Sequence, residues 1–214
     1  MTPERFQKIK DVLNKRQPDL TVVMDNVHKP HNLAAIIRSC DTVGIGDIYG
    51  VSTNEQISVN LKSASGSNHW VKLNIHDSVS SICSELGQKG FSIYAANGGE
   101  KGVDYRTINY SKPTAIVLGA ELDGISQETL NHVNGEIQIP MQGMVESLNV
   151  SVANAVILFE AQRQRWEAGL YASCRLDSET YEKLLFEFSY PEAARVLQSK
   201  GEGYPKLDED GQII

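Results

Sequence analysis

The sequence of 214 residues is poor in cysteine. The three that occur are odd in number and far apart, and none has CxxC spacing: Cys40, Cys83 and Cys174. Such a set excludes a disulfide framework and a cysteine-based zinc site, and it is typical of a reducing compartment. His28 and His31 flank Pro30 in an expected loop, and no neighbouring carboxylate or cysteine completes a ligand set. We therefore expect no metal.

Long hydrophobic runs are also absent. The longest apolar stretch, residues 150–159, contains Ser151 and Asn154 and is much shorter than the roughly 20 residues of a membrane span. The N-terminal sequence MTPERFQKIK carries charges where a signal peptide needs an apolar segment. We therefore expect a cytoplasmic protein that does not bind membranes.

The usual phosphate-binding loops are missing as well. No GxxxxGK[ST] occurs, and no GxGxxG follows the first expected strand. The GxSxG turn of α/β-hydrolases is absent too. These absences count against a P-loop nucleotide hydrolase, a nucleotide-dependent oxidoreductase and a serine hydrolase.

Basic residues are outnumbered by acidic ones, 20 to 27, for a net charge of −7. Such a balance excludes a surface that is basic throughout, so contact with a nucleic acid would have to use local patches. Residues 1–20 form one candidate patch, with five basic and three acidic side chains.

Short apolar or β-branched segments alternate with segments of helical periodicity. Six strands are expected, at residues 20–25, 47–52, 70–75, 91–96, 114–119 and 136–140. Residues 33–43 and 77–88 place apolar side chains at i, i+3, i+4 and i+7, which predicts helices. Strands that alternate with helices indicate an α/β fold with a mostly parallel sheet covered on both faces.

The two ends of the chain are expected to be helical. Residues 2–16 predict an amphipathic helix, and residues 147–168 predict a long one. Residues 178–200 predict two short helices that are separated near Pro191. The tail, residues 201–214, is rich in Gly and Asp, and we expect it to be loose.

The segment His28–Arg38 follows the first expected strand and begins a helix, a place where α/β proteins bind ligands. Asn32 is suited to be the N-cap of that helix, and Arg38 lies two turns further, beside the apolar stripe. The alternative is a simple helix cap followed by an arginine that extends along the edge of the core.

The segment Thr114–Ile125 is an apolar strand that ends at Gly119 and is followed by Glu121 and Gly124. Glycine at a strand end allows the backbone to approach a ligand closely. Glu121 would then be a carboxylate at the carboxyl edge of the sheet. The alternative is an ordinary strand, turn and helix with a solvated glutamate.

A third segment, Ile137–Asn154, leads from the last strand into the long helix. Ser147 or Asn149 is suited to cap that helix. Leu148 lies between these polar residues and needs an apolar cover, which a purine ring would provide.

Together the three segments resemble motifs one, two and three of the SPOUT methyltransferases, within them the SpoU group, and most closely the TrmH-type tRNA (guanosine-2′-O-)-methyltransferases. The match consists of N-x5-R, G-x-E-x-x-G and IP-M-x-G-x-x-x-SLNVSVA, each after the appropriate strand. The RQPDLTV and LLFE-x-x-YP segments resemble the terminal extensions of the TrmH type. The resemblance covers practically the whole chain.

The resemblance implies a Rossmann-like, mostly parallel six-stranded sheet with a C-terminal deep trefoil knot. It also implies an N-terminal helical extension (1–18), a catalytic domain (19–168) and a C-terminal helical extension with a tail (169–214). The family is dimeric, so we expect a homodimer in which motif one of each subunit faces the cofactor of the other.

The activity implied is 2′-O-methylation of a ribose in tRNA, at guanosine 18 of the D-loop, with S-adenosylmethionine as the methyl donor. The residues implied to bind the cofactor are Ala96, Asn97, Gly119, Ile139 and Leu148. The residues implied to carry the catalysis are Arg38, Asn32, Glu121, Ser147 and Asn149. Arg38 has the leading role, because its guanidinium would hold the 2′-oxygen and a neighbouring phosphate. Direct proton abstraction by Arg38 is the harder version, because a free arginine stays protonated at neutral pH; the alternative acceptor is a phosphate.

The basic side chains expected to bind RNA are Arg5, Lys8, Lys15, Arg16, Lys29, Arg163 and Arg165. A solvated helix face is the alternative for such a charge run. Two other functions stay open: 2′-O-methylation of ribosomal RNA or of another tRNA position, and a non-catalytic knotted module that binds RNA.

Overall fold

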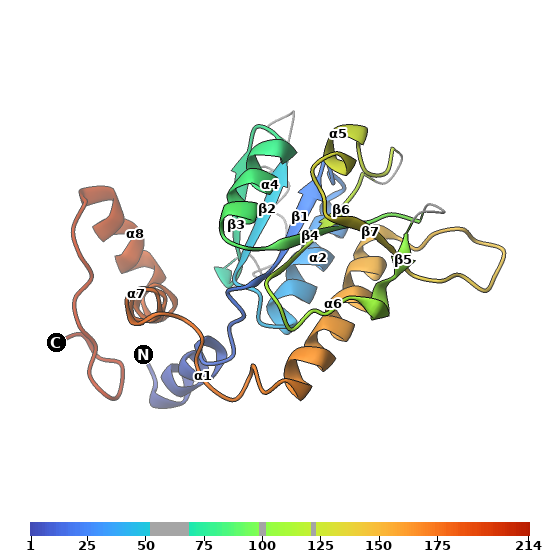
Figure 1. Ribbon diagram of the computed structural model, residues 1–214. Helices are drawn as coiled ribbons and strands as arrows, with labels where there is room; N and C mark the ends of the chain where they lie inside the picture. Colours follow the sequence, from blue (N-terminus) through green and yellow to red (C-terminus); the bar gives the residue numbers. More distant parts are fainter. Residues whose placement is uncertain (52–68, 99–101, 121–122) are drawn as a thin grey trace. The chain divides into compact units, whose positions relative to one another are not determined.

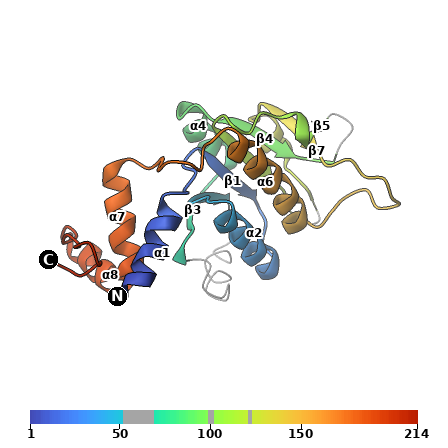
Figure 2. The same ribbon diagram turned by 90° about the horizontal axis from the view of Figure 1, so that it is seen from below.

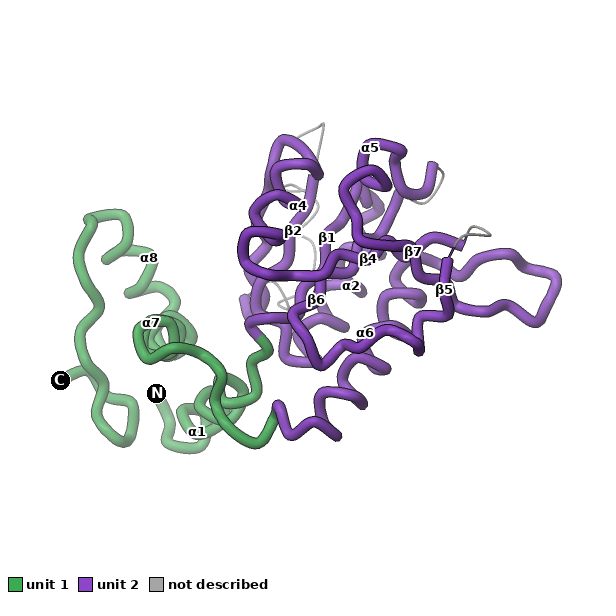
Figure 3. The backbone as a smooth tube through the Cα atoms, viewed as in Figure 1, with its two compact units in different colours: residues 1–17, 171–214 green, residues 18–170 purple. Residues whose placement is uncertain are grey.

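The computed structural model describes residues 1–51, 69–98, 102–120 and 123–214. The chain divides into two compact units (Figure 3): unit 2 is residues 18–170, and unit 1 combines residues 1–17 with residues 171–214. The N- and C-terminal extensions, expected as two separate segments, thus belong to one unit. No helix within the described ranges has both the length and the apolar character needed to cross a bilayer.

Unit 2 is an α/β structure (Figure 1). Its elements are β1 (Leu20–Asp25), α2 (Pro30–Thr42), β2 (Asp47–Val51), β3 (Lys72–His76), α4 (Val79–Gln88), β4 (Ser92–Ala96), β5 (Val103–Asp104), the 3-10 helix η2 (Tyr105–Thr107), β6 (Thr114–Leu118), α5 (Gln127–Leu130), β7 (Gly135–Gln138) and α6 (Val150–Glu167). The strands form one sheet in the order β3-β2-β1-β6-β4-β7-β5. Every strand pair in it is parallel.

The expected six strands all occur in the described parts of the chain, with boundaries shifted by at most two residues. The sheet has a seventh strand, β5, so the expectation of six was wrong. This strand has two residues, Val103 and Asp104, which pair with Ile137 and Gln138 of β7. A strand of that length has no alternation that a sequence pattern could reveal.

The sheet has a hydrophobic core on each face, because alternate residues of the central strands point in opposite directions. Val22 and Met24 of β1 belong to the core beneath α2 and α6, whereas Val23 belongs to the core beneath α4. Residues of β6 alternate in the same way. Figures 1 and 2 show α2 and α6 side by side on one face, with α4 on the other. Parallel sheets need this cover on both sides.

Unit 1 contains three helices: α1 (Pro3–Leu13), α7 (Ser178–Ser189) and α8 (Pro191–Lys200). The apolar stripe of α1, formed by Phe6, Ile9 and Leu13, is buried, and α1 packs against α7. Pro191 separates α7 from α8 as expected, because proline is accepted in the first turn of a helix but not in its interior.

The tail after α8 is folded onto unit 1, so the expectation of a loose tail was wrong. The ring of Tyr204 stacks on Phe186 with centroids 4.7 Å apart. The hydroxyl of Tyr190 donates to the carbonyl oxygen of Gly211 at 2.7 Å. Gly211 has a φ of +80°, and a Cβ at this position would lie 2.6 Å from the ring of Phe6. Aromatic packing and a glycine that allows close approach therefore order a segment whose composition predicts flexibility.

Candidate active site

The described chain forms a cavity at the carboxyl ends of β4, β6 and β7, which we call the strand-end cavity. Its volume is about 530 Å³. Because parallel strands end at the same edge of a sheet, the three loops recognised in the sequence meet there. All five residues expected to bind the cofactor line this cavity: Ala96, Asn97, Gly119, Ile139 and Leu148.

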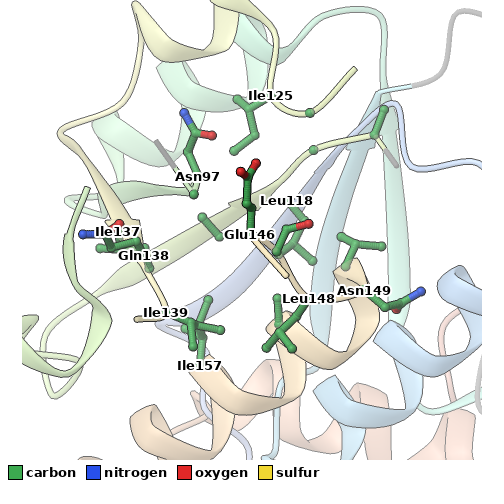
Figure 4. Close-up of a pocket in the computed structure, with 18 of the residues that line it drawn as sticks. Asn97, Leu118, Ile125, Ile137, Gln138, Ile139, Glu146, Leu148, Asn149 and Ile157 are labelled. Atoms are coloured by element: carbon green, nitrogen blue, oxygen red, sulfur yellow. The ribbon is translucent and has the colours of Figure 1, made fainter. Parts of the chain in front are cut away.

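Most of the side chains that line the cavity are apolar (Figure 4). Ile139, Ile157 and Leu148 occupy the lower part of the view, and Ile125 lies at its top. Asn97 and Glu146 place polar groups in the upper part. Apolar side chains combined with convergent polar groups are typical of a small-molecule site.

One wall of the cavity is a tight loop after β6. Ala120 N donates to Gly124 O at 2.9 Å, and Gly124 N donates to Ala120 O at 3.0 Å. A Cβ at Gly119 would collide with the backbone of Gly124 and would lie 2.5 Å from the nitrogen of Ile125. Glycine is therefore required at residue 119 by its own loop. Glu121, which the sequence assigns to catalysis, lies outside the described residues.

Another part of the cavity rim is fixed by Asn97, which follows β4. Its backbone nitrogen donates to Ile137 O at 3.0 Å, and its Nδ2 donates to Glu136 Oε2 at 2.7 Å. Both bonds connect the end of β4 to β7. They hold the backbone of residues 96–98 at the rim of the cavity without using a charged side chain of that segment.

Asn149 connects the third loop to the first. It is the N-cap of α6, where its Oδ1 accepts from the Ser151 nitrogen at 2.9 Å. Its Nδ2 donates to Asn32 Oδ1 at 3.1 Å. Asn32 is only 1% exposed. Motifs that are 117 residues apart are thus joined by one hydrogen bond between two amides.

Asn32 is not the N-cap of α2, so that expectation was wrong. The helix starts at Pro30, and the N-cap is Lys29, which makes no side-chain cap hydrogen bond. Proline with its fixed φ favours the first helical position, so the helix begins earlier than the cap pattern predicts. The amide of Asn32 is thereby available to Asn149.

Arg38 lies on α2 with an exposed side chain, and it does not line the strand-end cavity of its own chain. Its guanidinium makes no hydrogen bond or ion pair with any other residue in the described ranges. Ser147, in contrast, lines the cavity next to Leu148. The predicted loop residues therefore lie together at the cavity. Arg38 of the same chain does not lie there.

Arg165 was expected to bind RNA, and the structure excludes this role for the folded chain. Its side chain is fully buried near the end of α6. Nη1 is 2.6 Å from Asp19 Oδ1, and Nε donates to Tyr110 O at 2.9 Å. Nη2 donates to the carbonyl oxygens of Asp19 and Lys112. This guanidinium holds the end of α6 to the start of β1.

Arg16 is likewise only 2% exposed, with its guanidinium 5.9 Å from the centre of the Phe188 ring. It is a buried cation of unit 1 and does not belong to an RNA-binding surface. Arg163 is exposed, but its guanidinium is bonded to Glu160 and Glu167 at 2.7–2.9 Å. These carboxylates raise the pKa of Arg163.

Four of the expected RNA-binding residues have accessible side chains without such carboxylate partners. Arg5, Lys8 and Lys15 are exposed on unit 1. Lys29 is partly exposed and lines the strand-end cavity, as does Glu146. The sequence analysis did not place either of these two charged residues in the cavity, although Glu146 directly precedes Ser147.

Family models match nearly the entire chain. The SpoU rRNA Methylase family matches residues 19–159, and the family SpoU, rRNA methylase, C-terminal matches residues 163–214. The chain is 44% identical over 215 residues to a tRNA (guanosine(18)-2′-O)-methyltransferase of Escherichia coli (strain K12), covering 100% of this chain and 94% of that relative. It is 49% identical over 187 residues to the enzyme of the same name from Thermus thermophilus, covering 87% of this chain and 96% of that relative.

Solved structures agree with these matches. The A. aeolicus TrmH/SpoU tRNA modifying enzyme superposes with a TM-score of 0.79 at 39% identity, covering 88% of this chain and 96% of that one. An AdoMet-bound rRNA methyltransferase from Sinorhizobium meliloti superposes with a TM-score of 0.59 at 28% identity, covering 72% of this chain and 59% of that one. With three sequence motifs at one sheet edge and these matches along its whole length, the chain belongs to the SpoU methylase family.

Proposed function

We propose that this protein transfers a methyl group from S-adenosylmethionine to the ribose 2′-hydroxyl of guanosine 18 in tRNA. The observation that carries this proposal is the similarity, at 44% and 49% identity, to enzymes named for that reaction. The strand-end cavity supports it independently, because the motif residues meet there.

The cavity fits S-adenosylmethionine in size and chemistry. Its volume of about 530 Å³ lies in the range of roughly 300–1,000 Å³ that is usual for ligand pockets. The absence of a Cβ at Gly119 lets the backbone of Gly124 and Ile125 pack directly against it, which forms the wall of the cavity beside Leu118. Ile139 and Leu148 offer apolar surfaces for the adenine ring, and Ala96 and Asn97 offer backbone groups. When bound, S-adenosylmethionine supplies a methyl group already activated by the positive charge on its sulfur.

The reaction then requires that the chain align the ribose oxygen and stabilise it as its proton leaves. We assign this task to Arg38, whose planar guanidinium can bond the 2′-oxygen and a phosphate oxygen together. Because arginine stays protonated at neutral pH, the neighbouring phosphate is the better proton acceptor. Asn32 and Glu121 would hold the arginine or the RNA, and Ser147 and Asn149 would shape the loop beside them.

We further propose that the active form is a homodimer. Arg38 is exposed and does not line the cavity of its own chain, so Arg38 of the partner subunit would complete each site. Three large apolar side chains on α6 support a dimer interface, since they recur every seven residues and are 47%, 48% and 67% exposed: Val152, Phe159 and Trp166. A stripe of this kind is typical of a surface that another chain covers.

The deep trefoil knot implied by the resemblance is also part of this proposal. The sheet order places β4 between β6 and β7, so the chain crosses β4 on its way from β6 to β7. It passes through α5, which contacts α4, and then leaves β7 for α6, which packs against α2 on the other face. The loop of residues 139–149 carries the chain between the two faces next to the cavity, where the knot would close.

For RNA binding we propose the exposed side chains Arg5, Lys8 and Lys15 of unit 1, with Lys29 beside the cavity. Since the net charge is −7, these patches must act locally. Their contribution should depend steeply on salt, because each contact with a phosphate releases counterions.

The test is methylation of defined transcripts with labelled S-adenosylmethionine, followed by mapping of the modified nucleotide. We expect label at position 18 of an unmodified tRNA transcript and none in a matched transcript with adenosine at that position. Label in a ribosomal RNA fragment and not in tRNA would show that ribosomal RNA is the substrate. RNA binding without label in any transcript would refute the proposed enzymatic activity and would indicate a non-catalytic RNA-binding module.

A further inference from the structure

The last residue of β1, Asp25, has a buried carboxylate that the function described so far does not use. Its residue is 2% exposed. Oδ2 accepts three hydrogen bonds: from the Ser126 nitrogen at 3.0 Å, from Ser126 Oγ at 2.9 Å and from Thr129 Oγ1 at 2.6 Å. Oδ1 accepts from Asn26 Nδ2 at 3.0 Å. Asp25 is more than 100 residues away from Ser126 and Thr129 in the sequence.

These hydrogen bonds hold the C-terminal end of the loop after β6, which forms a wall of the strand-end cavity. At its start the loop is closed by the two hydrogen bonds between Ala120 and Gly124. At its end Ser126 is the N-cap of α5, and its Oγ accepts from the backbone nitrogen of Thr129, which is fully buried. Gly124 and Ile125, between the two ties, line the cavity, whereas Asp25 does not.

We propose that Asp25 is a positioning residue for the methyl donor: its carboxylate holds Ser126 and Thr129 and thereby sets the cavity wall formed by Gly119, Gly124 and Ile125. The inference rests on the proposed use of S-adenosylmethionine. The two oxygens of this side chain accept every one of these hydrogen bonds, so all of the surrounding polar groups act as donors toward it. Ile125 is directly followed by Ser126, so a shift of Ser126 moves the wall.

A matched control for Thr129 lies on the same strand as Asp25. Thr21 of β1 is 3% exposed, and its Oγ1 donates to the carbonyl oxygen of Asp47 at 2.7 Å. Thr21 and Thr129 are thus buried threonines with comparable hydrogen bonds. Only the hydrogen bond of Thr129 lies at the end of the loop that lines the cavity. Variants at the two positions therefore distinguish a general loss of stability from a displacement of the cavity wall.

The experiment compares Asp25→Asn, Thr129→Val and Thr21→Val in the full chain. We measure the Kd of S-adenosylhomocysteine by calorimetry, the KM of S-adenosylmethionine and kcat with tRNA, and the midpoint of urea unfolding. An asparagine replaces one of the two accepting oxygens by an NH2 donor, which would face either the Ser126 and Thr129 donors or the Asn26 amide. We expect Asp25→Asn to raise both Kd and KM about tenfold, with kcat at saturation within about threefold.

Thr129→Val should raise the same constants severalfold, and Thr129→Ser, which keeps the hydroxyl, should restore them. Thr21→Val should lower the urea midpoint as much as Thr129→Val while both constants stay unchanged. Wild-type constants in Thr129→Val, or an equal rise in Thr21→Val, would overturn the inference even if Asp25→Asn failed to fold. Failure of the wild-type protein to bind S-adenosylhomocysteine would instead refute the proposed function.

Discussion

Unit 2 is one continuous stretch of chain, whereas unit 1 is assembled from both ends. Unit 2 has a parallel sheet with a hydrophobic core on each face, and every residue that lines the strand-end cavity belongs to it. Unit 1 has three helices held by aromatic contacts such as Phe186 with Tyr204, and it exposes Arg5, Lys8 and Lys15. Under the proposed function, unit 2 would bind the methyl donor and carry the reaction, and unit 1 would add RNA affinity.

The largest expected effect lies in unit 2, at Arg38. Replacement by lysine removes the planar fork that can bond two oxygens together, so we expect kcat to fall by about 10²–10³. The Kd of S-adenosylhomocysteine should change little, because the proposed contacts of Arg38 are to the ribose oxygen and a phosphate of the RNA and not to the cofactor. Single-turnover methylation measures the first quantity and calorimetry the second.

Arg106 is a matched control in the same unit, since it is exposed and paired with Asp104. Arg106→Lys should keep the wild-type turnover. Near wild-type turnover in Arg38→Lys would remove Arg38 from the reaction.

The second prediction compares the contributions of two arginines of α6 in unit 2 to the free energy of unfolding. Arg165→Met breaks a buried ion pair with Asp19, so we expect the free energy of unfolding to fall by about 3–5 kcal/mol. Arg163→Met removes exposed ion pairs of the same helix and should change it by less than about 1 kcal/mol. Urea unfolding measures both. Equal losses would contradict the structural role of Arg165.

The third effect belongs to unit 1. Replacing Arg5, Lys8 and Lys15 with alanine should weaken tRNA binding about tenfold and reduce the slope of its salt dependence by about 2–3. The Kd of S-adenosylhomocysteine should stay at the wild-type value. Lys72→Ala combined with Lys112→Ala, two lysines of unit 2, serves as the control. A larger loss of tRNA affinity in the control would reverse the assignment of the two units.

The smallest effect concerns the cysteines, one exposed in unit 1 and two buried in unit 2. Burial, with a contribution from the Asp25 carboxylate, raises the pKa of Cys83 from 9.0 to about 11, and burial raises the pKa of Cys40. At pH 8 iodoacetamide should therefore modify Cys174 alone, as mass spectrometry would detect. Modification of Cys83 at that pH in the folded protein would contradict its burial.

The raised pKa of Cys83 also predicts a direction for stability. The folded state favours the protonated thiol, so this contribution is complete below pH 9 and is lost as the pH rises through about 11. A Cys83→Ala variant should show a weaker loss of stability over that interval.

Periodicity predicted the sheet because the strands are long enough to alternate or to be buried throughout, as in β1, where all six residues are buried. It could not predict β5, which has two residues. The residues of the three cavity loops could be predicted from the sequence, because glycine, asparagine and proline are favoured at particular turn positions for local conformational reasons. Charge did not distinguish Arg163 from Arg165, since burial is decided by residues far away in the sequence, in this case Asp19 and Tyr110.

Asp25 was missed for the same reason. Nothing around it marks a carboxylate that will receive bonds from Ser126 and Thr129, because those partners reach it only through the pairing of β1 with β6. Hydrogen bonds across such sequence distances depend on strand order, which a pattern of apolar residues does not specify.

The assembly of unit 1 from both termini has a consequence during synthesis. Helix α1 leaves the ribosome before its partner α7, which begins only at Ser178. At roughly 5–20 residues per second, Phe6, Ile9 and Leu13 stay without that partner for about 10–30 s. Unit 2, residues 18–170, is synthesised during that interval. A nascent chain that stops before α7 would therefore carry a completed sheet and an uncovered apolar stripe, the kind of surface that chaperones bind.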